Sequence, residues 1–212
     1  MNKHVITQTL VAGLTLGSMI STAAEWRLDD ADMATVEQGW GEAVAGRDVD
    51  GNPIVMGGKS FQHGLGTHAA SRMAIKLDGK ASSLTATVGI SDDQLGKQAR
   101  VEFIVTGDGK KLWSSGPVVP GVTKALDVPL RGVRDLVLVV TDGGNGMDYD
   151  HANWADGVIH HDGEAPRSGG EMISIVTGGW RMDARPGKSG ALEWTRAGTK
   201  DGRMRAPLRG AV

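Results

Sequence analysis

Two histidine-containing stretches carry the side chains best suited to chemistry. Residues 61–69, Phe-Gln-His-Gly-Leu-Gly-Thr-His-Ala, place His63 and His68 five positions apart, and residues 148–156, Asp-Tyr-Asp-His-Ala-Asn-Trp-Ala-Asp, carry His151. Imidazole, amide and carboxylate groups are planar donors and acceptors for hydroxyl groups, and an indole offers a flat apolar face. These residue types favour recognition of a sugar, which has hydroxyl groups around an apolar C–H patch and requires no unusual pKa.

We expect the fold to bring these stretches, or parts of them, to one rim. The candidate ligand-binding residues are Trp40, His63, His68, Asp148, His151, Asn153 and Trp154. Trp40 lies between two glycines, which suits a turn that either displays or buries its indole. The alternative is that each histidine is a hydrogen-bonded structural residue and each tryptophan belongs to the core, because glycines beside a tryptophan also serve close packing.

Acidic residues near both ends of the predicted domain suggest a calcium site. Calcium prefers several hard oxygen ligands, from carboxylates and backbone carbonyls, in an irregular loop. Asp30 and Asp32 would approach Asp156 if the first and last strands pair. Residues 142–150 are a second candidate, although they lack the spacing and the terminal Glu of an EF-hand loop. The alternative is a solvated acidic loop.

Several enzyme classes have no support in the sequence. Cysteine is absent, and no Gly-x-Ser-x-Gly motif is present. His160 and His161 are adjacent, so they would point to opposite faces of a strand rather than to one metal. Acidic pairs occur in several loops, and their spacing singles out none as a glycosidase pair. We therefore expect a binding protein rather than an enzyme.

Alternation of apolar and polar residues dominates the middle of the chain. Residues 73–77, 84–90 and 101–105 each alternate as half-buried strands do, and residues 107–109, Gly-Asp-Gly, form a hairpin signal. Residues 136–140 are continuously apolar, as expected of a central strand. No helical periodicity follows the first 24 residues. Many short strands at close spacing predict an all-β fold, a sandwich or a barrel.

The N-terminal 24 residues have the features of an export signal. Lys3 and His4 form a short basic region, residues 10–20 are apolar, and residues 21–24 supply small side chains for cleavage. The apolar run is too short to span a bilayer. We expect residues 1–24 to be a signal peptide and the protein to be secreted or periplasmic, without stable membrane insertion. A buried N-terminal helix is the alternative.

Composition limits the remaining possibilities. A chain of 212 residues and net charge −2 allows one domain with tails and lacks the basic field that nucleic-acid binding needs. After residue 161, residues 164–170 resemble a linker, and residues 173–177 and 191–195 are short β-like runs in a segment rich in Gly, Arg and Pro. We expect residues 162–212 to be a linker and poorly ordered tail, or the truncated start of a further module.

Five motifs together resemble the NPCBM family of carbohydrate-binding modules. They are Gln-Gly-Trp-Gly at residues 38–41, Gly-Asn-Pro-Ile at 51–54, His-Gly-Leu-Gly-Thr-His-Ala at 63–69, Ala-Thr-Val-Gly-Ile-Ser-Asp-Asp at 86–93, and residues 139–156. The resemblance covers residues 25–160 in the family's order and spacing. It implies a galactose-binding-like, jelly-roll β-sandwich, usually a non-catalytic module attached to glycoside hydrolases. Related members bind galactose-containing glycans and carry a structural calcium.

The chain departs from this pattern in two places. We expect no hydrolase domain within these 212 residues, and residues 42–46, Glu-Ala-Val-Ala-Gly, lack the charged residues expected there. We therefore predict an exported carbohydrate-binding β-sandwich over residues 25–161 that recognises terminal galactose-type glycans without cleaving them. The alternatives are an envelope protein that uses the sandwich for protein–protein assembly, or a truncated accessory part of a glycoside hydrolase.

Overall fold

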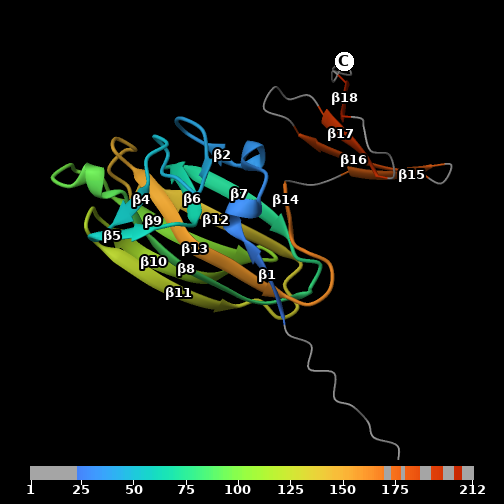
Figure 1. Ribbon diagram of the computed structural model, residues 1–212, viewed down its shortest axis with the longest axis horizontal. Helices are drawn as coiled ribbons and strands as arrows, with labels where there is room; N and C mark the ends of the chain where they lie inside the picture. The colour runs from blue at the N-terminus through green and yellow to red at the C-terminus, as the bar shows by residue number, and fades with distance from the viewer. Residues whose placement is uncertain (1–22, 170–172, 178–179, 187–191, 198–202, 207–212) are drawn as a thin grey trace, which may run out of the picture.

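The computed structural model describes residues 23–169, 173–177, 180–186, 192–197 and 203–206. Two antiparallel sheets make up the main body, which confirms the predicted all-β sandwich (Figure 1). Residues 1–22, nearly all of the predicted signal peptide, lie outside the described residues. Within the described ranges, no helix has the length and apolar character that crossing a bilayer requires.

The first sheet is built around its longest strand, β13. Its order is β11-β8-β13-β6-β3, and β1 also pairs with β13. The strands are β1 (Ala24–Arg27), β3 (Val44–Ala45), β6 (Gly64–His68), β8 (Ala81–Ile90), β11 (Thr123–Pro129) and β13 (His151–His161). One edge of β13 pairs with β8, and the other pairs first with β6 and then with β1. The first and last strands of the predicted domain therefore do pair, with Arg27 opposite Val158.

The second sheet has the order β10-β9-β12-β7-β14, with β2 also paired to β7. Its strands are β2 (Glu37–Gln38), β7 (Ser71–Lys76), β9 (Val101–Gly107), β10 (Lys110–Val118), β12 (Asp135–Thr141) and β14 (Arg167–Ser168). Strands β9 and β10 form the hairpin predicted from Gly-Asp-Gly. Strand β14 pairs with β7, so the sheet continues beyond the boundary at residue 161 that the sequence suggested.

Smaller elements complete the chain. Strands β4 (Ile54–Met56) and β5 (Lys59–Phe61) form a hairpin, and the 3₁₀ turns are η1 (Leu28–Asp30), η2 (Met33–Thr35) and η3 (Asp92–Gln94). Strands β15 (Ile173–Thr177), β16 (Trp180–Pro186), β17 (Leu192–Ala197) and β18 (Arg203–Ala206) form an antiparallel sheet of their own. The sequence had predicted only two β-like runs there.

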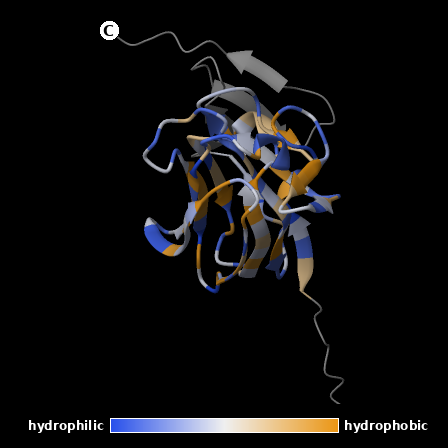
Figure 2. Cartoon of the chain, turned by 90° about the vertical axis from the view of Figure 1, so that its left-hand side faces the viewer, coloured by the Kyte–Doolittle hydropathy of each residue, from blue (hydrophilic) through white to orange (hydrophobic). Residues whose placement is uncertain are grey.

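The core lies between the two main sheets because each strand turns every second side chain inward. Phe103 on β9 and Leu136 on β12 are fully buried, and the ring of Phe103 packs edge-on against Trp154 of β13 with centroids 5.1 Å apart. Figure 2 shows hydrophobic residues recurring along the strands of the sandwich. Burial of each large side chain contributes about 1.5–3 kcal/mol, so this facing set holds the sheets together.

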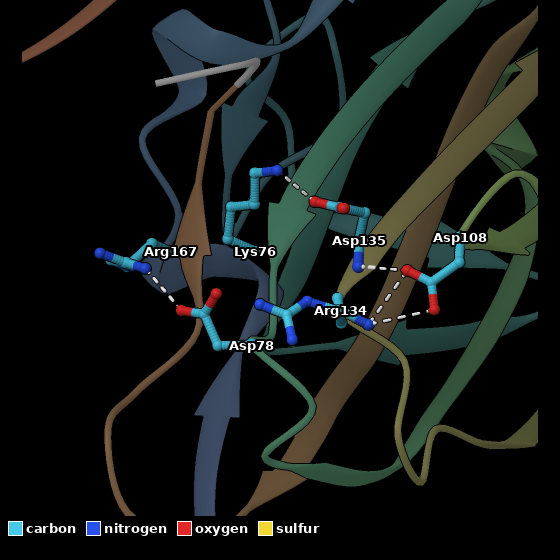
Figure 3. A network of polar contacts seen from close by, with 6 residues as sticks. All are labelled: Lys76, Asp78, Asp108, Arg134, Asp135 and Arg167. Carbon is cyan, nitrogen blue, oxygen red and sulfur yellow. Dashed lines mark hydrogen bonds and ion pairs between the residues drawn. The ribbon is translucent and has the colours of Figure 1, made fainter. Parts of the chain in front are cut away.

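A polar network fixes the second sheet at the Lys76 end of β7 (Figure 3). Asp108, in the β9–β10 turn, accepts hydrogen bonds from the backbone N–H groups of residues 134 and 135 at 2.9–3.1 Å. Lys76 forms an ion pair with Asp135, and Arg167 donates to Asp78 at 2.6 Å. The network links the hairpin turn, β12, β7 and β14 at the end of β7 away from Ser71.

Candidate functional site

Three of the predicted side chains meet at one end of the sandwich. His68 ends β6 and His151 begins β13, and the two residues lie directly opposite each other in the sheet. Trp40 follows β2, and its ring centroid is 5.2 Å from that of His68 and 5.8 Å from that of His151, with the His151 ring nearly parallel to the indole at 18°. We call Trp40, His68 and His151 the aromatic rim.

The indole of Trp40 is displayed rather than buried, with 50% of the residue exposed. Gln38 holds the backbone of Trp40: its Nε2 donates to the Trp40 carbonyl at 2.7 Å, and its Oε1 accepts from Thr67 Oγ1 at 2.7 Å. Gly41 has φ +66, which a glycine adopts at little cost. The Gly-Trp-Gly sequence therefore serves a tight turn that presents an aromatic face.

His68 offers the rim a hydrogen-bond acceptor. Its Nδ1 lies 2.6 Å from the Ala69 carbonyl oxygen, so Nδ1 carries the proton and donates it. Nε2 of the neutral ring is then the acceptor. Burial lowers the pKa of His68 from its usual value, an effect that the hydrogen bond to Ala69 partly opposes. The neutral form therefore dominates at neutral pH.

His151 is held by residues that the sequence did not single out. Asp50 Oδ2 lies 3.0 Å from His151 Nδ1, and the Gln94 side-chain amide lies 3.2 Å from the same nitrogen. Asp48 Oδ1 accepts the backbone N–H of Asp50 at 3.0 Å and so positions that carboxylate. The tautomer that donates from Nδ1 to Asp50 has its acceptor at Nε2, whereas the tautomer that accepts from Gln94 Nε2 at Nδ1 has a donor at the Nε2 of its own ring. The sequence feature that could have pointed to Asp50 was the turn-rich composition of residues 47–58.

A hollow of about 200 Å³ adjoins the aromatic rim. It is lined by Trp40, His68, Met147, Asp148, Tyr149 and His151. The structure thus places the predicted Asp148 beside the rim, together with Met147 and Tyr149, which were not predicted. An apolar indole face, two imidazole rings and a carboxylate suit the binding of a hydroxylated ligand.

Trp154 and Asn153 do not lie on the rim, contrary to the prediction. Trp154 is 1% exposed and packs against Phe103 in the core. Because side chains alternate along β13, Trp154 faces the opposite side of the strand from His151. Asn153 shares the face of His151 but is fully buried, and its Nδ2 donates to Ser91 Oγ at 2.8 Å. Both residues support the fold beneath the site.

His63 lies away from the aromatic rim. It precedes β6, whose first residue pairs with Ala155, whereas His68 at the other end pairs with His151. The His63 ring instead contacts Asp29, with Nδ1 2.9 Å from Asp29 Oδ2. The two histidines of the first motif therefore occupy opposite ends of one strand.

The predicted calcium ligands lie in the region where β1 meets β13. Asp30 Oδ2 accepts the backbone N–H of Arg27 at 3.2 Å, and Asp32 Oδ1 accepts that of Ala34 at 3.0 Å. Asp156 is exposed at a bulge of β13, with φ +47. These three carboxylates do not gather into a group whose ligand atoms all lie within 4.8 Å of one another.

Two other features of the described residues bear on metal binding. Asp50, Asp93 and His151 do form such a group, with all ligand atoms within 4.8 Å. Separately, the Oδ1 atom of Asp29, in η1, is buried without a hydrogen-bond partner. A buried carboxylate oxygen without a donor is costly unless a cation or water completes it.

Comparison of the sequence with known proteins identifies one domain family and two relatives. The model of the NPCBM/NEW2 domain family matches residues 24–160. A "Putative endo-alpha-N-acetylgalactosaminidase" of Renibacterium salmoninarum is 35% identical over 135 residues, which is 62% of this chain and 8% of that protein. Alpha-1,3-galactosidase B of Akkermansia muciniphila is 32% identical over 131 residues, 59% of this chain and 16% of the relative. The chain thus spans less than a fifth of either relative.

Solved structures give the same result for the fold. A CBM51 module of Clostridium perfringens GH95, in complex with methyl-galactose, has a TM-score of 0.60 at 29% identity over 64% of this chain and 99% of that one. CBM51-2 of Clostridium perfringens ZmpB, in complex with GlcNAc, has a TM-score of 0.61 at 28% identity over 65% of this chain and 32% of that one. These likenesses confirm the predicted sandwich and its class, a carbohydrate-binding module. The chain belongs to the NPCBM/NEW2 domain family.

Proposed function

We propose that the aromatic rim and its hollow bind the terminal residue of a galactose-type glycan. The observation that carries this proposal is the half-exposed Trp40 indole packed against the rings of His68, whose Nε2 is an acceptor, and His151. The axial 4-hydroxyl of galactose leaves one face of the ring with C–H groups only, which suits stacking on an indole. Nε2 of His68 and the Asp148 carboxylate then accept hydrogen bonds from the sugar hydroxyls.

The relatives support the choice of sugar. The two curated relatives are named for galactose and for N-acetylgalactosamine, which share this axial hydroxyl, and one solved neighbour holds methyl-galactose. Another neighbour holds GlcNAc, whose 4-hydroxyl is equatorial, so the two sugars are the pair to compare. We further propose that the protein is exported and acts as a binding module within, or beside, a glycoside hydrolase.

The test is a calorimetric titration with methyl-galactoside and with methyl-N-acetylglucosaminide. We expect measurable binding of methyl-galactoside and weaker binding of the glucosaminide. Trp40→Ala should abolish galactoside binding while leaving the melting temperature nearly unchanged, because the indole is half exposed. Trp113→Ala, which removes a partly buried tryptophan of β10 in the second sheet, is the control and should retain binding at temperatures where the variant is folded. A folded protein that binds neither sugar would overturn the proposal.

We also propose a structural calcium at η1, with the Asp29 carboxylate as a direct ligand. The buried, unpartnered Asp29 Oδ1 supports this position. Asp30 and Asp32 lie within three residues of Asp29, Asp156 donates its backbone N–H to the carbonyl of His63, whose ring contacts Asp29, and backbone carbonyls would supply the remaining oxygens. Calcium there would contribute charge neutralisation and would hold the end of β1 against β13.

A further inference from the structure

A second hollow lies next to the first and shares a wall with it. It measures about 320 Å³ and is lined by Gly96, Lys97, Gln98, Asn145, Asp148 and Tyr149. Asp148 and Tyr149 line both hollows, so two adjacent residues separate them. At about 200 Å³, the hollow beside the aromatic rim is smaller than most small-ligand sites, which span roughly 300–1,000 Å³. The combined volume of the two hollows falls within that range.

The second hollow offers donors and acceptors without net charge. Lys97 Nζ lies 5.0 Å from the centroid of the Tyr149 ring, an arrangement that holds the ammonium at the aromatic face. Asn145 Nδ2 donates to the Gln98 carbonyl at 2.7 Å, which leaves Asn145 Oδ1 as an acceptor. The Asp148 carboxylate balances the charge of Lys97. This set matches sugar hydroxyls and gives no preference to an anionic group.

The shared wall is built on a backbone conformation that tyrosine rarely adopts. Residues 147–150 form a turn closed by the Asp150 N–H and the Met147 carbonyl at 3.3 Å, and Tyr149, its third residue, has φ +67. Glycine is the residue this position favours, and another side chain there costs about 1 kcal/mol or more. The tyrosine is nevertheless 47% exposed, so packing of its ring in the core does not offset that conformational energy. Such strain is typical of ligand-contacting positions.

We propose that the second hollow binds the next sugar residue of the same glycan, so that the ligand is a neutral, galactose-terminated disaccharide or longer chain. Tyr149 contacts both sugar residues, and Lys97 and Asn145 bond the hydroxyls of the second. This inference rests on the proposed function, because it assigns the terminal residue to the aromatic rim.

The test compares methyl-galactoside with neutral galactosyl disaccharides, α-linked and β-linked, by calorimetry on the full chain. We expect at least one disaccharide to bind about ten-fold more tightly than methyl-galactoside. Lys97→Ala should remove most of that gain and affect methyl-galactoside far less, because Lys97 does not line the first hollow and reaches it only through the Tyr149 ring. Lys111→Ala, on β10, is the matched control and should keep the full gain. Tyr149→Gly should weaken both ligands while preserving the turn.

The outcomes separate the two proposals. If methyl-galactoside binds but no disaccharide binds more tightly, the second hollow is not a subsite and this inference fails while the proposed function stands. A gain restricted to sialylated or sulfated disaccharides would overturn the assignment of a neutral sugar. Equal loss of both ligands in Lys97→Ala would also contradict it. If neither ligand binds, the proposed function fails and this inference fails with it.

Discussion

At the scale of single residues, the alternation of β13 decides which side chains can reach a ligand. His151 and Trp154 are three positions apart, so they point to opposite faces of the strand, and only His151 reaches the aromatic rim. This consequence of strand geometry was available from the sequence once residues 151–161 were assigned to a strand. The burial of Asn153 beside Ser91 was not, because it depends on contacts between residues distant in the chain.

His68 predicts how sugar binding depends on pH. Burial lowers its pKa, so its Nε2 remains an acceptor at neutral pH and becomes a donor only under acidic conditions. We expect galactoside affinity to be constant from pH 8 to pH 7 and to fall about three- to ten-fold once the pH is low enough to protonate His68, the equivalent of one lost hydrogen bond. Isothermal titration calorimetry with methyl-galactoside, repeated from pH 8 downward, measures this affinity.

The neighbouring Asp50, Asp148 and His151 also face the hollow or the rim, so a control must isolate His68. His68→Gln keeps a side-chain acceptor but does not titrate. If the pH dependence persists unchanged in His68→Gln, a different group is responsible and the assignment to His68 is wrong.

Asp150 predicts a pH dependence of stability. Burial raises its pKa to about 6 from 3.8, although its hydrogen bond from the Arg100 backbone N–H opposes the shift. Between these two values the folded state holds the proton and the unfolded state has lost it, so the free energy of unfolding falls as pH rises from about 4 to about 6. The full effect corresponds to about 3 kcal/mol at most.

Asp150→Asn removes this titration and keeps an acceptor for Arg100. Urea unfolding of both proteins at pH 4, 5, 6 and 7 should therefore show wild-type stability falling relative to the variant as pH rises. Asp48, whose pKa burial also raises, remains in both proteins and cancels from the difference. A difference that does not change with pH would contradict the prediction.

At the scale of elements, a close backbone approach joins the loop after β3 to β6. A Cβ atom at Gly66 would lie 2.3 Å from the Arg47 carbonyl oxygen and 2.4 Å from the Asp48 carbonyl carbon. Only glycine allows this contact. The approach brings residues 47–52 over the sheet and so places Asp50 against His151. Gly66, the second glycine of the His-Gly-Leu-Gly motif, therefore helps to position His151 of the other histidine motif.

Gly66→Ala should consequently disturb both stability and binding. Backbone atoms must move to admit the methyl group, with an expected loss of about 1–3 kcal/mol in the free energy of unfolding and weaker galactoside binding. Gly58→Ala is the control, because its Cβ would meet no atom within 4 Å and only the positive φ of +74 is penalised. Chemical denaturation and calorimetry of both variants test this, and retention of full affinity by Gly66→Ala would contradict it.

The sequence predicted the strands with a clear period and missed both the shortest strands and most of β13, the longest one. Strands β7, β8, β9 and β12 alternate or run apolar over at least five residues, which is enough to show a period. Strands β2, β3 and β14 have two residues each and therefore no period. Their pairing depends on neighbours far along the chain, as when Arg167 pairs with Lys76. Strand β14 therefore joins the second sheet from beyond the predicted boundary at residue 161.

At the scale of the whole molecule, the order of strands in each sheet was not predicted, because periodicity shows where strands run and not which strands pair. Pairing of β1 with β13 was foreseen only as a condition for the acidic residues to meet. That condition holds, yet the three predicted carboxylates do not converge, because Asp30 and Asp32 turn to cap backbone N–H groups in their own loop.

Calcium binding provides a test at this scale. If calcium is held at η1, added calcium should raise the melting temperature, and chelation should reverse the rise, because a ligand that binds only the folded state stabilises it. Asp29→Asn should abolish the calcium-dependent shift, and Asp93→Asn should leave it intact. The opposite pattern would place the ion at the group formed by Asp50, Asp93 and His151.

The pairing of β1 along the far half of β13 also separates the start of the sandwich from the aromatic rim. Ala24 lies opposite His161, whereas the aromatic rim begins at His151, ten residues away, or roughly 33 Å at 3.3 Å per residue. In Figure 1, β1 begins at that far end of the sandwich. A sugar bound at the rim as proposed therefore lies at the opposite end of the first sheet from the start of β1.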